Sequence, residues 1–320
     1  MQSQSVRADQ IRPILLLEMA AELVWDRRWP ATQTRVLMRK RGSNNPWRYN
    51  LFASDAPSSF DEVLRKEVQL AMVNPAAPLG MAVRGTGPYK EPLPLRVITT
   101  LPSADQFGMA VAESTGITSL AEIGAKRYPL RISMREQTDH SDYIAANEVF
   151  KALGFSLDDL VSWGGKIVPR PGLSFNVGAL QSGEIDAFFE EGVHIWVGQA
   201  LDAGMRLLPV DPPLAKKLEA VGWPCSLITK AQFPQLAEDV LAPDFSGWPI
   251  FTHAETPDDL VRSFCQALEA RKDRIPWEGG PTKGGPPLPL EWMCKDGPDT
   301  PLSAPLHPAA EAFWHEQGYI

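Results

Sequence analysis

The stretch that decides the fold is Tyr128-Pro-Leu-Arg-Ile-Ser-Met134, a strand-like run that breaks into the polar string Arg135-Glu-Gln-Thr-Asp-His-Ser141. A helix pattern follows over residues 142–154. Strand, polar loop and helix N-terminus together can read a ligand, because free backbone N–H groups and the helix dipole point at whatever the loop encloses. The pattern indicates a protein that holds a small polar molecule.

A second polar loop follows another apolar strand. The strand Ile185–Phe189 runs into Glu190-Glu-Gly-Val-His-Ile-Trp196, which is rich in ionisable groups. Between and around these loops, strand and helix patterns alternate from residue 131 to residue 210, which favours a sheet with parallel strands covered by helices. We therefore expect the loops near residues 138 and 192 to face each other across a shared gap.

Composition excludes several kinds of partner. The chain has 320 residues and a formal net charge of -8, so whole-molecule attraction to nucleic acid or anionic lipid is not expected. No apolar run reaches the ~18 residues needed to span a bilayer. The three cysteines, Cys225, Cys265 and Cys294, have neither metal-ligand spacing nor the even number of a complete disulfide framework. We expect no cofactor and no membrane insertion.

The N-terminal region predicts a helix over residues 8–26 rather than a secretory leader. The run Ile14-Leu-Leu-Leu17 is interrupted by Glu18 and again by Glu22, so a continuous apolar core of a leader is missing. Apolar residues recur at helical spacing, as in an amphipathic surface helix. As written, the chain is expected in the cytoplasm; if a leader was removed, it is expected in the periplasm.

Several ordered segments resemble the TAXI family of solute-binding proteins, which serve TRAP transporters, and the wider NMT1-like group with the type II periplasmic binding protein fold. The resemblance implies an α/β protein of two lobes, each a mostly parallel sheet flanked by helices, joined by a hinge and closing on a ligand. Where the family has a small hydroxyl-rich loop, this chain has Arg135–His140, and only Thr138 and Ser141 keep that character. The segments that carry the resemblance are Val68–Asn74, Gly116–Ile123, Arg131–Ser141, Leu180–Phe189, Arg206–Asp211 and Leu306–Gly318.

The resemblance also implies a discontinuous domain organisation. Lobe I is expected to comprise residues 1–108 and 229–320, and lobe II residues 109–228, inserted between them and carrying both polar loops. The hinge is expected to lie in Pro102–Ala112 and Trp248–His253. Hinge closure can bury a small molecule almost completely.

Two candidate ligand contacts follow directly from their positions. Asn74 lies at the carboxyl end of a predicted strand, where ligands sit in open α/β sheets, although Asn-Pro also suits a simple turn. Arg135 can form a bidentate pair with a ligand carboxylate. The competing interpretation pairs Arg135 with the neighbouring Glu136 or Asp139.

The rest of the first loop offers hydrogen-bonding groups. Gln137, Thr138 and Ser141 suit contacts with a polar ligand, while the hydroxyls also suit capping of the following helix. His140 can act as a polar contact, a general base or a metal ligand.

The second loop offers two adjacent carboxylates. Glu190 and Glu191 can accept an amine, hydroxyls or a cation, and His194 lies three residues further on. A metal site of His140, His194 and one glutamate is chemically allowed, but it requires both loops to converge, and hydrogen bonding to a ligand is the preferred interpretation. Trp248 can form an aromatic wall, with core packing as its alternative.

These observations lead to one main functional hypothesis and two alternatives. The main hypothesis is a protein that captures an organic acid or a related polar metabolite, as the solute-binding component of a TRAP-type transporter whose membrane subunits are its partners. The first alternative is a cytoplasmic enzyme on the same fold, a decarboxylase or lyase acting on an aromatic or hydroxy acid. The second is a cytoplasmic ligand sensor. Fold alone does not separate them.

Overall fold

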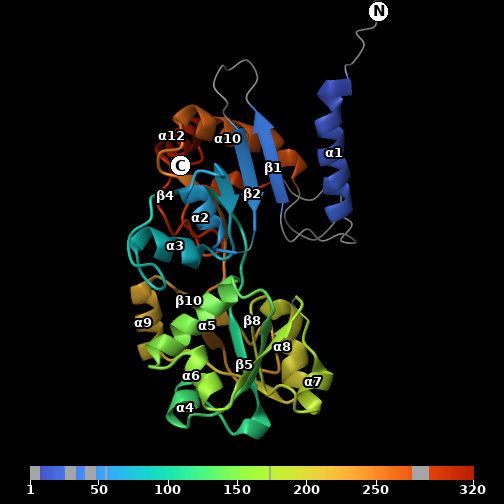
Figure 1. Ribbon diagram of the computed structural model, residues 1–320, viewed down its shortest axis with the longest axis vertical. Helices are drawn as coiled ribbons and strands as arrows, with labels where there is room; N and C mark the ends of the chain where they lie inside the picture. The colour runs from blue at the N-terminus through green and yellow to red at the C-terminus, as the bar shows by residue number, and fades with distance from the viewer. Residues whose placement is uncertain (1–7, 26–33, 40–47, 55, 173, 276–287) are drawn as a thin grey trace, which may run out of the picture.

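The computed structural model describes residues 8–25, 34–39, 48–54, 56–172, 174–275 and 288–320. They form two lobes, each built around a five-stranded sheet, stacked along the long axis of the molecule (Figure 1). The sheet of lobe I has the strand order β1-β2-β3-β12-β4, and the sheet of lobe II has the order β7-β6-β8-β5-β9. The expected two-lobed α/β fold is confirmed.

The elements of lobe I come from both ends of the chain. They are α1 (Ala8–Trp25), β1 (Thr34–Arg39), β2 (Arg48–Ala53), α2 (Ser59–Leu64), β3 (Leu70–Met72), α3 (Ala76–Arg84), β4 (Leu95–Leu101), β12 (Trp248–His253), α10 (Asp258–Arg271) with the 3₁₀ turn Lys272–Arg274, α11 (Leu290–Met293) and α12 (Pro308–Gln317).

The elements of lobe II are continuous in sequence. They are β5 (Gly108–Ala112) with the 3₁₀ turn Glu113–Thr115, α4 (Leu120–Ala125), β6 (Arg131–Arg135), α5 (Ser141–Ala152), α6 (Leu157–Ser162), β7 (Lys166–Arg170), α7 (Val177–Gln181), β8 (Ala187–Glu190), α8 (Val193–Asp202), β9 (Met205–Leu207), α9 (Pro212–Val221), and the antiparallel pair β10 (Cys225–Ile228) and β11 (Val240–Pro243).

Both sheets are mixed, which corrects the expectation of mostly parallel sheets. In lobe I, β2 and β3 are parallel, whereas β12 is antiparallel to β3 and β4. In lobe II, β6 is parallel to β7 and β8, whereas β5 is antiparallel to β8 and β9. The reason is that β5 and β12 begin at the crossing between the lobes and run away from it. Their antiparallel neighbours β8 and β3 must therefore end at the crossing, with their carboxyl ends between the lobes.

The crossing itself is a short antiparallel ladder. Phe107 N donates to Pro243 O at 2.8 Å, Phe245 N donates to Asp105 O at 2.8 Å, and Gly247 N donates to Ser103 O at 3.0 Å. The crossing therefore consists of residues 103–107 and 243–247, where we propose that the hinge lies. The strands β5 and β12, which the sequence analysis included in the hinge, belong to the two sheets on either side of it.

The cores show how the chain is divided between the lobes. Phe233, Leu236 and Val240 pack in the same cluster as Ala110 and Phe188 of the lobe II sheet. We propose that the inserted lobe extends to Pro243, past the division at residue 228 expected from the sequence. A second cluster of lobe II includes Ala77 and Met81 from α3 of lobe I, so the two lobes touch through this helix.

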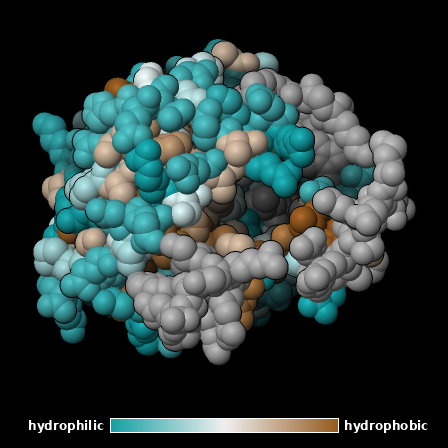
Figure 2. Space-filling view, turned by 90° about the horizontal axis from the view of Figure 1, so that it is seen from above, coloured by the Kyte–Doolittle hydropathy of each residue, from teal (hydrophilic) through white to brown (hydrophobic). Residues whose placement is uncertain are grey.

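Helix α1 differs from the amphipathic helix that its sequence predicts. Ile14, Leu15, Leu16 and Leu17 are each 50 to 61% exposed, and four consecutive residues point to all sides of a helix. The apolar surface of α1 therefore surrounds the helix instead of forming one stripe. Seen from above lobe I, exposed hydrophobic residues also lie beside a hollow (Figure 2). Among the described residues, none of the helices combines the length and hydropathy that a membrane span requires.

The hinge residue Phe245 tests how far the lobe II core depends on the crossing segments. Its ring is fully buried and lies 6.3 Å from the rings of Phe107, Trp223 and His140. We expect Phe245→Ala to lower the free energy of unfolding by about 3–5 kcal/mol, because it removes a buried ring and leaves a cavity. The change is measured by urea unfolding. Ile195→Ala, at a 42% exposed position, is the control and should change it by less than about 0.5 kcal/mol. A loss below 1 kcal/mol in Phe245→Ala would contradict this account of the hinge.

Candidate functional site

The parallel pairing of β6 with β7 and β8 brings four charged side chains to one sheet edge. Arg135 at the end of β6 is in register with Arg170 at the end of β7. Glu190 ends β8, the other parallel neighbour of β6, and Glu191 follows it. Ends of parallel strands in open α/β sheets are common places for ligands, and here they face lobe I.

Ion pairs connect these side chains. Arg135 Nε donates to Glu190 Oε1 at 2.8 Å, and Arg135 Nη2 is paired with Glu191 Oε1. Arg170 Nη2 is paired with Glu190 Oε2, and its guanidinium lies 4.3 Å from the centre of the Phe188 ring. The side chains of Glu190 and Arg170 are 0% and 9% exposed. Charges this deeply buried require partners, because an unpaired one costs several kcal/mol.

The structure shows which carboxylates lie next to Arg135. Its guanidinium pairs with Glu190 and Glu191 from the second loop, whereas Glu136 and Asp139 are exposed. The side chain of Arg135 is 14% exposed and is the most accessible of these four charged side chains. Arg170, Glu191 and Glu190 follow in order of decreasing exposure. The two loops therefore face each other, as the sequence analysis expected.

The start of α5 adds a histidine and a third carboxylate. His140 caps the helix, and its Nδ1 accepts a hydrogen bond from Asp142 N at 3.2 Å. Both side chains are fully buried, with His140 Nδ1 lying 3.4 Å from Asp142 Oδ2 and His140 Nε2 3.9 Å from Glu191 Oε1. Asp142 Oδ2 is also 3.8 Å from Arg135 Nε. The helix start and the sheet edge thus form one charged cluster.

This environment changes the acidity of two groups. Burial and, to a smaller extent, the nearby negative charge of Asp142 raise the pKa of Glu191 to about 8, against the opposing effects of His140 and Arg135. Burial lowers the pKa of the Arg170 guanidinium to about 10. The Glu191 carboxyl can therefore exchange a proton near neutral pH, a property that clefts with chemical roles often show.

Lobe I contributes the opposite wall through Asn74. The Ser141 hydroxyl donates to Asn74 O at 2.6 Å, and the Ser58 hydroxyl donates to Asp139 Oδ2 at 3.1 Å. Asn74 is 6% exposed, and within the described residues its Oδ1 accepts no hydrogen bond. A buried amide oxygen of this kind normally has a partner, so Asn74 is suited to a bound polar group.

Other predicted residues lie outside the buried cluster. Gln137 is half-buried, Thr138 is exposed, and His194 is exposed on α8. Trp248 is half-buried at the start of β12, where it pairs with Leu101. Their suggested ligand contacts remain predictions.

The sequence analysis missed Arg170, Asp142 and Asp105. Arg170 ends a predicted strand next to β6, and its position at the same sheet edge was the available signal. Asp142 was part of a helix pattern and gave no separate signal. Asp105 lies in the hinge, and its carboxylate accepts hydrogen bonds from Gly192 N at 2.8 Å and Val193 N at 3.3 Å, at the start of α8.

Asp105 yields a test of this link between hinge and second loop. Burial raises the pKa of its carboxyl to about 6, against the backbone N–H donors that lower it. The folded chain therefore holds this proton more tightly than the unfolded chain, so the stabilisation is complete below about pH 4 and is lost as the pH rises through about 6. We expect wild type to lose up to about 3 kcal/mol in this window relative to Asp105→Asn, which cannot titrate. The free energies of unfolding of both proteins are measured by urea unfolding from pH 4 to 7. If they change with pH in parallel, the raised pKa of Asp105 is contradicted.

One group of side chains in the described part of the chain could hold a metal ion. His140, Asp142 and Glu191 each offer a ligand atom, and these atoms lie within 4.8 Å of one another. The combination expected from the sequence included His194, whose exposed position on α8 separates it from this group. Asp142 takes the place that had been assigned to His194.

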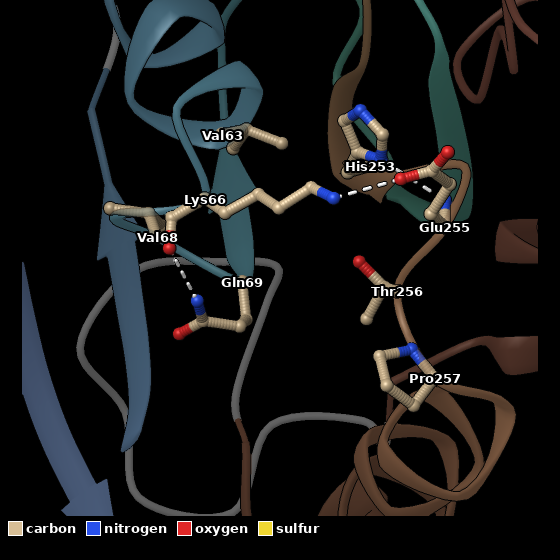
Figure 3. A pocket seen from close by; sticks show the side chains of 8 residues that line it. All are labelled: Val63, Lys66, Val68, Gln69, His253, Glu255, Thr256 and Pro257. Atoms are coloured by element: carbon tan, nitrogen blue, oxygen red, sulfur yellow. Dashed lines mark hydrogen bonds and ion pairs between the residues drawn. The ribbon is translucent and has the colours of Figure 1, made fainter. Parts of the chain in front are cut away.

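Two surface pockets lie away from this cluster. One, of about 150 Å³, lies in lobe I between the end of α2 and the turn after β12 (Figure 3). The ion pair of Lys66 with Glu255, 2.8 Å long, extends across it, and both side chains are largely exposed. The other, of about 490 Å³, lies beside β9 and is lined by Arg206, Glu113 and residues 235–240. Neither brings together buried polar groups as the interlobe cluster does.

Comparison with known proteins gives likenesses of fold. No family model matches the chain. It is similar to a structure described as a periplasmic transporter (18% identity, TM-score 0.32, covering 64% of each chain) and to a glycine betaine/L-proline-binding protein from Borrelia burgdorferi (10%, 0.37, 66% of each). It is also similar to a Candida albicans protein described as having the generic periplasmic binding protein fold (12%, 0.35, 68% of this chain and 59% of that one).

The aligned part spans between 59% and 66% of these three proteins, less than two thirds of each. At such identities and TM-scores the likenesses concern the fold at most. The ligand class must therefore come from the chain's own side chains.

Proposed function

We propose that this protein binds a small polar solute between its two lobes, as the solute-binding component of a TRAP-type transporter. The observation that carries the proposal is the convergence of three strand ends at the hinge. Asn74 after β3 faces the start of α5 across the lobes, through the 2.6 Å bond from Ser141 to Asn74 O. Arg135 at the end of β6 and Glu191 directly after β8 lie next to the start of α5 and form an ion pair there.

The hinge makes closure on a solute mechanically simple. Among the described residues, two segments cross between the lobes, and backbone hydrogen bonds hold them in one ladder. Small changes in the backbone angles of residues 103–107 and 243–247 can therefore rotate one lobe against the other, with Ala77 and Met81 of α3 shifting against the lobe II core that they touch. The interlobe bonds of Ser141 and Ser58 are single contacts that such a rotation can break and reform.

The charges favour an organic acid or a related polar metabolite. Arg135 is the most accessible charge in the cluster, and a guanidinium can hold a carboxylate with two parallel hydrogen bonds. Its present partner Glu191 has a raised pKa, so protonation of Glu191 can release the guanidinium to the solute. Asn74 supplies an amide to the opposite side of the solute.

A second candidate function is an enzyme on the same fold that acts on an aromatic or hydroxy acid. The observation favouring it is the pair of His140 and Glu191, 3.9 Å apart, in which Glu191 can exchange a proton near neutral pH. Such pairs serve as general acid and base. An enzyme consumes its ligand, whereas a binding protein returns it unchanged.

A thermal-shift screen of carboxylates, amines and polyols, followed by product analysis of every hit, tests both candidates. We expect a hit to raise the melting temperature and to be recovered intact after prolonged incubation. Conversion of the hit to a product would instead support the enzyme. The absence of any stabilising compound among carboxylates would contradict the proposed solute class.

Substitutions then test where the solute binds. We expect Arg135→Ala and Glu191→Ala each to weaken a hit at least tenfold, about 1.4 kcal/mol or more, because the first removes the guanidinium that holds the solute carboxylate and the second removes the protonated carboxyl that can donate a hydrogen bond to it. Affinity is measured by isothermal titration calorimetry, and circular dichroism verifies that each variant is folded. Glu136→Ala, an exposed neighbour, is the control. Unchanged affinity in both site variants would contradict the interlobe location.

A further inference from the structure

The group formed by His140, Asp142 and Glu191 is deeply buried. The three residues are 1%, 0% and 5% exposed, and their ligand atoms lie within 4.8 Å of one another. One imidazole nitrogen and two carboxylates are thus held in a small volume at the lobe interface. Phe245 stacks on the His140 ring at 6.3 Å, which limits its rotation.

Charge in this cluster is not balanced by the arginines alone. Three carboxylates, those of Asp142, Glu190 and Glu191, face the two guanidiniums of Arg135 and Arg170. The guanidiniums pair with Glu190 and with Oε1 of Glu191, whereas Asp142 lies 3.8 Å from the nearer of them. When Glu191 is ionised together with Asp142 and Glu190, as binding of a cation through all three ligands requires, the carboxylates outnumber the guanidiniums by one among the described residues of the cluster.

Several carboxylate oxygens point into this volume without a hydrogen bond. Within the described residues, neither oxygen of Asp142 nor Oε2 of Glu191 has a hydrogen-bond donor other than the proton that Glu191, when protonated, shares with Asp142. Buried carboxylate oxygens are normally hydrogen-bonded or bound to a cation. The lack of donors for these oxygens is an observation independent of the spacing of the three residues, and both observations indicate a bound cation.

We propose that His140, Asp142 and Glu191 bind a divalent transition-metal ion of the Zn²⁺ or Mn²⁺ type. A nitrogen ligand with two carboxylates suits these ions, whereas Ca²⁺ takes six to eight oxygens. The Arg135 pair with Glu191 Oε1 orients that carboxylate, and Oε2 would then be available to the ion. The inference rests on the proposed function: three protein ligands leave coordination positions for oxygens of an acidic solute between the lobes.

Metal binding is tested on the full, tag-free chain after treatment with EDTA and dialysis. Titration with ZnCl₂ or MnCl₂ alone, followed by calorimetry, is expected to give one ion per chain and a raised melting temperature. We expect His140→Ala and Asp142→Asn each to weaken binding of the ion at least tenfold. His194→Ala removes an exposed histidine three residues from Glu191 and is the matched control, expected to bind as wild type does.

The outcomes separate this inference from the proposed function. No stoichiometric ion in wild type, or equal affinity in wild type and in folded Asp142→Asn, overturns the metal site. If a solute binds the ion-free wild-type chain as tightly in buffer with EDTA as in buffer without it, the ion plays no part in the site. This result overturns the metal site but leaves solute binding in place. An ion that binds through His140 while no carboxylate stabilises the chain supports the metal site and contradicts the proposed solute class.

Discussion

The arrangement of this protein depends on the buried ion pairs of Arg135 with Glu190 and Glu191. Two loops far apart in the sequence are held at one sheet edge because each supplies charges that the other must neutralise. Arg170 continues the network on the far side of Glu190. Removal of one partner would leave a charge in the interior, so the loops are fixed together and the start of α5 is fixed with them.

The direction of the strands places this network between the lobes. Since β5 and β12 leave the crossing, the strands that pair antiparallel with them arrive at it, and their polar ends meet there. Asp105 joins the hinge to the second loop through the start of α8. A rotation at the hinge therefore changes the distance between Asn74 and the charged cluster while each sheet remains intact. This coupling makes the structure suitable for enclosing a solute.

The sequence was sufficient for the parts of the fold with a strong local pattern. The apolar run before Arg135 and the helix after His140 predict β6 and α5 with small shifts at the ends. The two lobes were expected only because several segments resemble a known family. Helix α3 was missed because Ala76-Ala-Pro-Leu-Gly-Met-Ala82 contains both proline and glycine, which normally interrupt helices. The mixed sheets depend on where the chain crosses between lobes, a long-range property without a local signal.

The site was predictable to a similar degree. The convergence of the two loops followed from parallel strand ends meeting at one edge, but the partners within it did not. Arg135 pairs across the sheet with Glu190 and Glu191, whereas its neighbours Glu136 and Asp139 are exposed. Asp142 joins His140 where His194 had been considered, since helix geometry turns Asp142 inward and leaves His194 exposed. Trp196 lies in the core, where its Nε1 donates to Glu191 O at 2.9 Å. Contacts of this kind depend on side-chain packing, which no short pattern encodes.

A crystal structure of the protein with a stabilising carboxylate tests the central claim most directly. The account predicts the solute between the lobes, in contact with Asn74 on one side and with the cluster of Arg135, His140 and Glu191 on the other. A solute bound in the 490 Å³ pocket beside β9, or in the lobe I pocket at Lys66, with the interlobe cluster untouched, would contradict it.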